Sequence, residues 1–261
     1  IAEYLIKLKN ADKTNKYGCY GFLPENNEQY LGEYDDSSLI NCLGTSKDGE
    51  ELYKDVLDMY YYKIKNQNWT DNDEVSPLFS NPYTNLKSLN NVGYALIDID
   101  GNGVPELLIG DNESVSDGVI IDLYTYIDDS IVYLDTSDER YGINLSKNGR
   151  IYRYGSGGAG LTEVEECKID MDNLKLTTVE GVLYDEDDAK DTPWFYGEGD
   201  EYSNSNGYDI SKMKNITEEE GMNKWDEYSN NIKGYTISFF SNYTPKKSKE
   251  DIDAGIYEEF I

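Results

Sequence analysis

Hydrophobic residues change their spacing near residue 90, and this change divides the chain into two regions. Over residues 48–66, apolar side chains recur every three or four positions, which predicts an amphipathic helix. The stretches on either side are rich in Asn, Asp, Gly and Pro, which are typical of irregular structure. Residues 1–90 are therefore expected to form a mainly helical and irregular N-terminal region.

Short apolar runs separated by turn residues follow after residue 90. They lie at 94–98, 104–109, 119–126, 131–134, 149–154, 161–169 and 174–179. Runs of this length, bounded by Gly, Asn, Asp and Ser, predict β-strands. Parallel strands need long crossovers, whereas these turns are short, so we expect an antiparallel meander.

Helical signals return towards the end of the chain. Residues 185–212 are acidic and rich in Gly, Ser and Asn, so a surface loop is expected there. The capping box that begins at Thr217 predicts a helix to about residue 230, with Met222 and Trp225 packed inward.

A strand at 235–240 and an amphipathic helix at 248–260 complete the predicted elements. The fold class they indicate is α+β: a central antiparallel β-sheet, arranged as a meander, with N-terminal and C-terminal helices packed on it. Residues 91–261 hold the sheet and the C-terminal helices, either as a second region or as one continuous domain with residues 1–90.

The charge of the chain restricts its partners. Lys and Arg number 23 against 52 Asp and Glu, a formal net charge of -29. Nucleic acid and anionic membranes would repel such a chain, whereas cations and neutral or basic partners are favoured. No apolar run reaches the roughly 20 residues that span a bilayer, although a lipid anchor in a longer form of the protein is compatible with this.

The chain has no histidine, which excludes Ser-His-Asp and Cys-His catalysis and imidazole-based zinc sites. The three cysteines, Cys19, Cys42 and Cys167, form no CxxC pair. Two alternatives stay open: a bridge between Cys19 and Cys42 with Cys167 as a buried strand thiol, or three unpaired thiols.

One segment has the ligand spacing of a calcium loop. Between Asp98 and Glu106 the sequence is Asp-Ile-Asp-Gly-Asn-Gly-Val-Pro-Glu. Oxygens at alternate positions, from the side chains of Asp98, Asp100, Asn102 and Glu106 and the backbone carbonyl of Val104, converge when the backbone curls around an ion. The alternative is an ordinary acidic turn, because Asp-Gly and Asn-Gly are also common in hairpins.

This loop resembles those of EF-hands and of integrin-type FG-GAP repeats. The FG-GAP pattern is the closer one, because the twelfth position is Ile109 and not Glu, and because both flanks are predicted strands. The order of elements, with the segments at 93–110, 154–159 and 216–220, resembles uncharacterised secreted or lipid-anchored proteins of clostridia-like Gram-positive bacteria. That resemblance implies an extracellular or cell-surface location and a calcium loop, and it implies no activity.

Two further groups of residues are weaker candidates. Trp194 and Tyr196, in the predicted acidic loop, are candidates for a ligand-binding surface. Acidic clusters at Glu163, Glu165 and Glu166, and at Asp185 to Asp188, could supply a glycosidase pair, but the alternation of Glu163 and Glu165 is typical of a solvent-facing strand.

We therefore expect a secreted or cell-surface module, stabilised by calcium, that binds an unknown protein or glycan ligand or has a structural role. A carboxylate-dependent glycan hydrolase is the alternative, and the sequence favours a non-enzymatic role over it.

Overall fold

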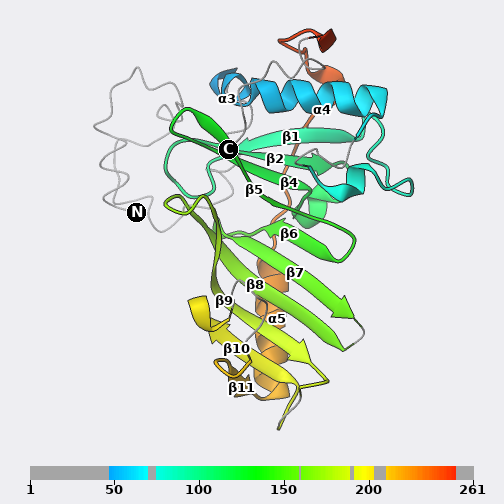
Figure 1. Cartoon of the computed structure of the whole chain (residues 1–261). Coiled ribbons are helices and arrows are strands. Elements are labelled where there is room, and N and C mark those ends of the chain that lie inside the picture. The colour runs from blue at the N-terminus through cyan, green and yellow to red at the C-terminus, as the bar shows by residue number, and fades with distance from the viewer. Residues whose placement is uncertain (1–46, 70–74, 159, 189–190, 203–209, 251–261) are drawn as a thin grey trace, which may run out of the picture.

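The computed structural model describes residues 47–69, 75–158, 160–188, 191–202 and 210–250. Within them, strands form two antiparallel sheets, with helices packed on the outer faces (Figure 1). The predicted α+β class is confirmed, and the strands are divided between two sheets. No helix in the described part of the chain is long and apolar enough to cross a membrane.

The first sheet has five strands in the order β12-β1-β2-β4-β5. Their bounds are Ser238–Phe239 (β12), Val92–Ile97 (β1), Glu106–Asp111 (β2), Asp122–Ile127 (β4) and Ser130–Thr136 (β5). Helices α3 (Lys47–Leu52) and α4 (Lys54–Asn66) replace the single helix predicted at 48–66, and α4 lies across one face of this sheet (Figure 1).

The core between α4 and the first sheet is rich in tyrosine and surrounds a buried acid. Asp122 is fully buried, and its carboxylate accepts hydrogen bonds from the hydroxyls of Tyr60 (2.6 Å) and Tyr133 (2.8 Å) and from the N–H of Ser76 (3.1 Å). Neutral donors thus satisfy this carboxylate, as a buried polar group requires.

The second sheet has seven strands in the order β11-β10-β9-β8-β7-β6-β3. Their bounds are Lys214–Ile216 (β11), Trp194–Glu198 (β10), Lys175–Asp185 (β9), Leu161–Asp170 (β8), Ile151–Gly158 (β7), Tyr141–Leu145 (β6) and Val119–Ile120 (β3). The strand predicted at 119–126 is therefore two strands, because the chain passes from the second sheet to the first at Ile121.

A second core fills the space between the two sheets. Alternate residues of β1 and β2, such as Ile97 and Leu108, face away from α4 and pack with Ile143, Ile151 and Cys167 of the second sheet. Both faces of the first sheet are therefore buried. Cys167 is a buried free thiol, which agrees with both alternatives and does not decide between them.

Helix α5 (Glu218–Asn231) covers the other face of the second sheet and begins with the predicted capping box at Thr217. The carboxylate of Glu180 on β9 accepts from Lys224 Nζ (2.8 Å) and the hydroxyl of Tyr228 (2.8 Å), which attaches the helix to the sheet. Trp225 packs against this face, but the prediction for Met222 is wrong, because that side chain is 51% exposed.

Several other predictions need correction or lie outside the described residues. Residues 185–212 are not one long loop, because β10 pairs with β9 and β11 and a 3-10 turn, η4 (Gly199–Glu201), follows it. Only Ser238–Phe239 of the strand predicted at 235–240 is formed. Residues 1–46, with Cys19 and Cys42, and most of the helix predicted at 248–260 lie outside the described residues.

The packing of α5 against β10 can be tested by substituting Gly221 with alanine. The added methyl group would clash with Trp194, whereas alanine has a higher helix propensity than glycine. A Cβ at Gly221 would lie 2.3 Å from the Trp194 ring. Gly221→Ala should therefore lower the free energy of unfolding by roughly 1–3 kcal/mol, although Ala favours an exposed helix by roughly 0.5–1 kcal/mol.

The control for this test is Asn223→Ala, at an exposed position of the same helix, which should leave stability unchanged or raise it slightly. Thermal unfolding of both variants measures the effect. A Gly221→Ala protein that melts above the wild type would contradict the packing of Trp194 against the helix.

Candidate metal centre

The candidate loop connects β1 to β2 at the junction of the two cores. The hairpin closes with Ile97 opposite Glu106, so residues 98–105 form the loop. Gly101 (φ 76°) and Gly103 (φ 91°) adopt left-handed backbone conformations that other residues rarely adopt. These two glycines let the backbone curl and turn the acidic side chains inward.

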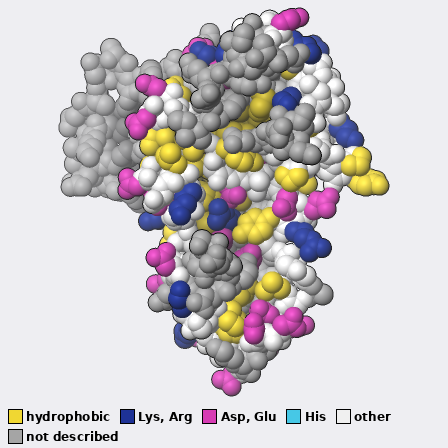
Figure 2. Space-filling model, in the orientation of Figure 1, with side chains coloured by type: hydrophobic (Ala, Val, Ile, Leu, Met, Phe, Trp, Pro, Cys, Tyr) yellow, Lys and Arg dark blue, Asp and Glu magenta, His cyan; other side chains and the backbone are white. Residues whose placement is uncertain are grey.

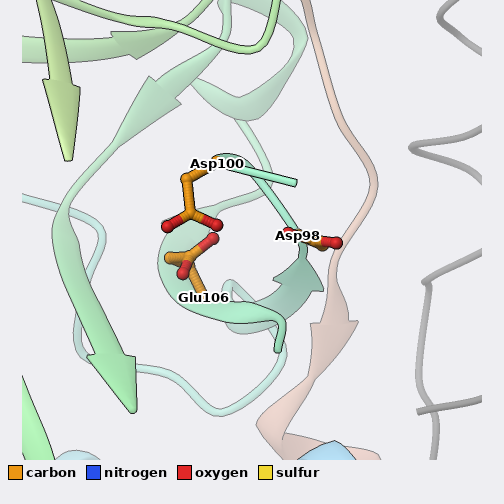
Figure 3. Close-up of side chains that lie close together, drawn as sticks. All are labelled: Asp98, Asp100 and Glu106. Atoms are coloured by element: carbon orange, nitrogen blue, oxygen red, sulfur yellow. The ribbon is translucent and has the colours of Figure 1, made fainter. Parts of the chain in front are cut away.

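The loop brings three of the predicted ligands together. Carboxylate oxygens of Asp98, Asp100 and Glu106 lie within 4.8 Å of one another. Figure 3 shows Asp100 and Glu106 facing each other across the loop, with Asp98 beside them at the end of β1. This is the convergence that the spacing of the sequence predicts.

Glu106 is the buried member of the cluster, with no exposed surface. Its Oε2 accepts from the N–H of Ile99 (2.7 Å), and its Oε1 accepts from the hydroxyl of Thr125 (3.0 Å) on the neighbouring strand β4. The Glu106 side chain is therefore fixed from two sides, by its own loop and by the sheet.

Asp98 and Asp100 are held by the backbone and side chains of the loop. Asp98 Oδ2 accepts from the N–H of Gly103 (3.0 Å), whereas Asp98 Oδ1 is buried and has no hydrogen-bond partner in the described part of the chain. Asp100 is exposed and accepts from the N–H of Asn102 (2.9 Å) and from its side-chain amide (3.0 Å).

The other two predicted ligands lie differently. The side-chain oxygen of Asn102 accepts from the N–H of Val104 (2.6 Å), which leaves its second lone pair for an ion. The hydrogen bond described for Val104 is formed by its N–H and not by its carbonyl.

Burial makes the ionised cluster costly. Burial, with the charge of Asp100 adding to it, raises the pKa of Asp98 to about 6, although hydrogen bonds from backbone N–H groups of the loop lower this pKa in part. Although the Asp100 residue is exposed, partial desolvation of its carboxylate raises its pKa. Burial raises the pKa of Glu106 well above its usual range, and the charges of Asp100 and Asp98 add to this shift. No Lys or Arg in the described ranges forms an ion pair with these three carboxylates.

A desolvated group of hard oxygen ligands without a protein cation can hold a metal ion. An ion would offset the mutual repulsion of the carboxylates and bind the unpaired oxygen of Asp98. The donors are all oxygens, which suit calcium or magnesium better than soft metals.

Trp194 and Tyr196 lie on β10, about half-buried, and not on a loop. The Trp194 ring packs against Gly221 of α5, and the Tyr196 hydroxyl donates to Glu180 (2.6 Å) and Glu198 (2.9 Å). Both side chains therefore take part in attaching α5 to the second sheet.

Glu163 and Glu165 are buried, so their expected solvent-facing position is wrong. They face the side of the second sheet opposite α5, where Glu165 pairs with Arg153 (3.3 Å), which also pairs with Asp135 (2.6 Å) of the first sheet. Arg153 and Asp135 were not predicted as functional residues. The one signal in the sequence was the opposite charge of Arg153 and Glu165, and it becomes informative only once the register that places them opposite each other is known.

The raised pKa of Asp98 predicts a pH-dependent response to calcium. Without a divalent cation, Asp98 binds a proton more readily in the folded protein than in the unfolded chain between pH about 4 and 6. Protonated Asp98 therefore contributes its full stabilisation below this range, and this contribution is lost as the pH rises through 6. A cation bound at the cluster would displace these protons, so calcium should raise the melting temperature more at pH 7.5 than at pH 5.

Thermal unfolding in EDTA and in calcium, at both pH values, measures this difference. Asp98→Asn is the reference, since it removes the titrating group. An equal calcium effect at both pH values in the wild type would contradict the assignment of the proton-binding group.

A comparison with models of known protein families, with curated proteins and with solved structures gives no match for this chain. The resemblance to secreted clostridia-like proteins and to FG-GAP loops therefore stays a prediction. What the geometry establishes is an acidic cluster, made of Asp98, Asp100 and Glu106, that could hold a metal ion.

Proposed function

We propose that this protein is a calcium-stabilised binding or structural module that acts outside the cell or on its surface. One observation carries the proposal: three carboxylates converge in the β1–β2 loop, and one buried oxygen of Asp98 has no hydrogen-bond partner in the described ranges. Carboxylates, a side-chain amide and a backbone carbonyl within one tight loop are the donors that calcium prefers.

The ion would act on the fold and not on a substrate. The loop joins two strands whose sheet is buried on both faces, and Ile99 inside the loop belongs to the core between the sheets. In addition, the Tyr53 hydroxyl, just before α4, donates to the carbonyl of Pro105 (2.8 Å) in the same loop. Fixing the loop therefore fixes the places where α4 and both sheets meet.

An extracellular location would supply the calcium that a weak site needs. Loops with few ligands in extracellular modules bind calcium with Kd values of about 10⁻⁴–10⁻³ M, which only the millimolar calcium outside cells would load. The absence of histidine is compatible with this role, since none of the proposed ligands is an imidazole.

The hydrolase alternative gains no specific support. The acids Glu163 and Glu165 are buried, and Glu165 is engaged by Arg153 and by the hydroxyl of Thr178. A residue held in an ion pair between strands serves the packing of the sheets and is poorly placed to exchange protons with a substrate.

Calcium should stabilise the wild type and not the ligand variants. At about 1 mM calcium and a Kd of about 10⁻⁴–10⁻³ M, the gain in unfolding free energy is roughly 0.4–1.4 kcal/mol, which raises the melting temperature by about 1–6 °C. Asp98→Asn and Glu106→Gln should lose this gain.

In EDTA at pH 7.5, Glu106→Gln should melt at or above the wild-type temperature, because it removes a buried charge.

Asp172→Asn is the matched control, because it changes the same charge in an exposed turn between β8 and β9 and should keep the full calcium response. Isothermal titration gives the stoichiometry directly. A calcium response that persists in Asp98→Asn at the wild-type affinity would rule out the proposed site.

A further inference from the structure

A surface groove lies on the second sheet, beside α5 and away from the metal centre. Its volume is about 550 Å³, within the range of ligand sites. Figure 1 shows α5 crossing behind β7 and β8 and leaving their hairpin end uncovered by a helix. The groove occupies the sheet beside α5, bounded by the turn between β5 and β6.

The floor of the groove is formed by three neighbouring strands. Gly142 on β6 lies opposite Tyr154 on β7, and Ser156 on β7 lies opposite Thr162 on β8. Among the residues that the structure describes, a Cβ at Gly142 would meet one atom within 4 Å, the side-chain oxygen of Asn144 at 3.8 Å. Packing does not require glycine there, and the absence of a side chain leaves the groove open.

One wall of the groove is aromatic and held in place. Trp225 of α5 lines the groove, and its ring makes edge-to-face contacts with Tyr154 (ring centroids 5.9 Å apart) and Trp194 (6.5 Å). Each of these three rings remains partly exposed. An aromatic ring fixed in this way offers an apolar surface to a ligand at little cost in conformational entropy.

The remaining lining is polar. The hydroxyl of Thr162 and the guanidinium of Arg140 line the groove, and neither has a hydrogen-bond partner or ion pair among the residues that the structure describes. Arg140 lies at the rim with Glu139. Donors and acceptors therefore surround an aromatic wall, which suits a ligand that has both C–H faces and hydroxyl groups.

Other classes of ligand fit the groove less well. An extended peptide that adds a strand needs a free sheet edge. The strands β7 and β8 are paired on both sides, and β6 is paired with β3 at Ile143 and Asn144, so only a short stretch of β6 is left as an edge. The net charge of -29 disfavours polyanions such as nucleic acid or acidic glycans.

We infer that this groove binds a neutral oligosaccharide, whose sugar ring stacks on Trp225 and whose hydroxyls bond to the polar rim. The inference rests on the proposed function as a binding module and names its ligand class. It does not depend on the calcium ion, because none of the groove residues belongs to the loop at 98–106.

The test is binding of the whole chain to neutral hexasaccharides (maltohexaose, cellohexaose, laminarihexaose and chitohexaose) and to polygalacturonate, by isothermal titration and on a glycan array. At least one neutral glycan should bind, and more tightly than polygalacturonate. Trp225→Ala should weaken that binding at least about tenfold, as expected for a central aromatic contact.

Gly142→Leu is the second variant, because it fills the groove at a position where a side chain meets no close neighbour, and it should abolish binding without lowering the melting temperature. Tyr83→Ala, which removes an aromatic side chain that is 93% exposed elsewhere on the surface, should bind as the wild type does.

Three results would overturn the inference: no neutral glycan bound by the wild type, tighter binding of polygalacturonate, or full binding by a folded Gly142→Leu protein.

Asp98→Asn separates the proposal for the metal centre from the proposal for the groove. If glycan binding survives in a variant that has lost its calcium response, the groove is independent of the metal centre, and if calcium binds but no glycan does, only the inference about the groove fails.

Discussion

The need to satisfy buried carboxylates governs this structure. The chain has 52 acidic residues but only 23 Lys and Arg, so most acids cannot have a cation as partner. Tyrosine hydroxyls take that role repeatedly: Asp122 is bonded by two tyrosines, Asp58 by Tyr243, and Glu180 by two others. A phenol can donate from within a packed core, which explains how 25 tyrosines serve both packing and hydrogen bonding.

The β1–β2 loop is the exception to this pattern. Its carboxylates receive hydrogen bonds from the backbone, from Thr125 and from Asn102, but from no tyrosine, and Asp98 keeps one buried oxygen without a partner in the described ranges. Elsewhere the chain supplies the donors itself. In this loop, an ion from the solvent could satisfy the buried carboxylates instead. The loop lies where α4 and both sheets meet.

Much of the fold could be predicted from local patterns. The capping box at Thr217 and the hairpin around residues 98–106 were predicted correctly, because short-range geometry determines both. The division into two sheets could not be predicted, since the strand at 119–126 has one continuous apolar pattern and its break at Ile121 depends on which sheet each half meets. The strand β10 could not be predicted either. The acidic, Gly-rich sequence around it indicated a loop, but β10 is stabilised by pairing with β9 and β11, which the local sequence does not reveal.

The candidate sites show the same contrast. Asp98, Asp100 and Glu106 could be predicted as a cluster because all three lie within nine consecutive residues of one hairpin. The burial of Glu165 could not be predicted, since its partner Arg153 comes from the neighbouring strand and also pairs with Asp135 of the other sheet. Trp225 was expected only as a packing residue, and its position beside the groove depends on how far α5 extends over the sheet.

The most direct test of the central claim is a crystal structure of the protein grown in millimolar calcium, with the ion identified by its anomalous scattering. One ion should be bound by oxygens of Asp98, Asp100 and Glu106 at about 2.3–2.6 Å. Water at that position, with the hydrogen bonds of the loop unchanged, would contradict it.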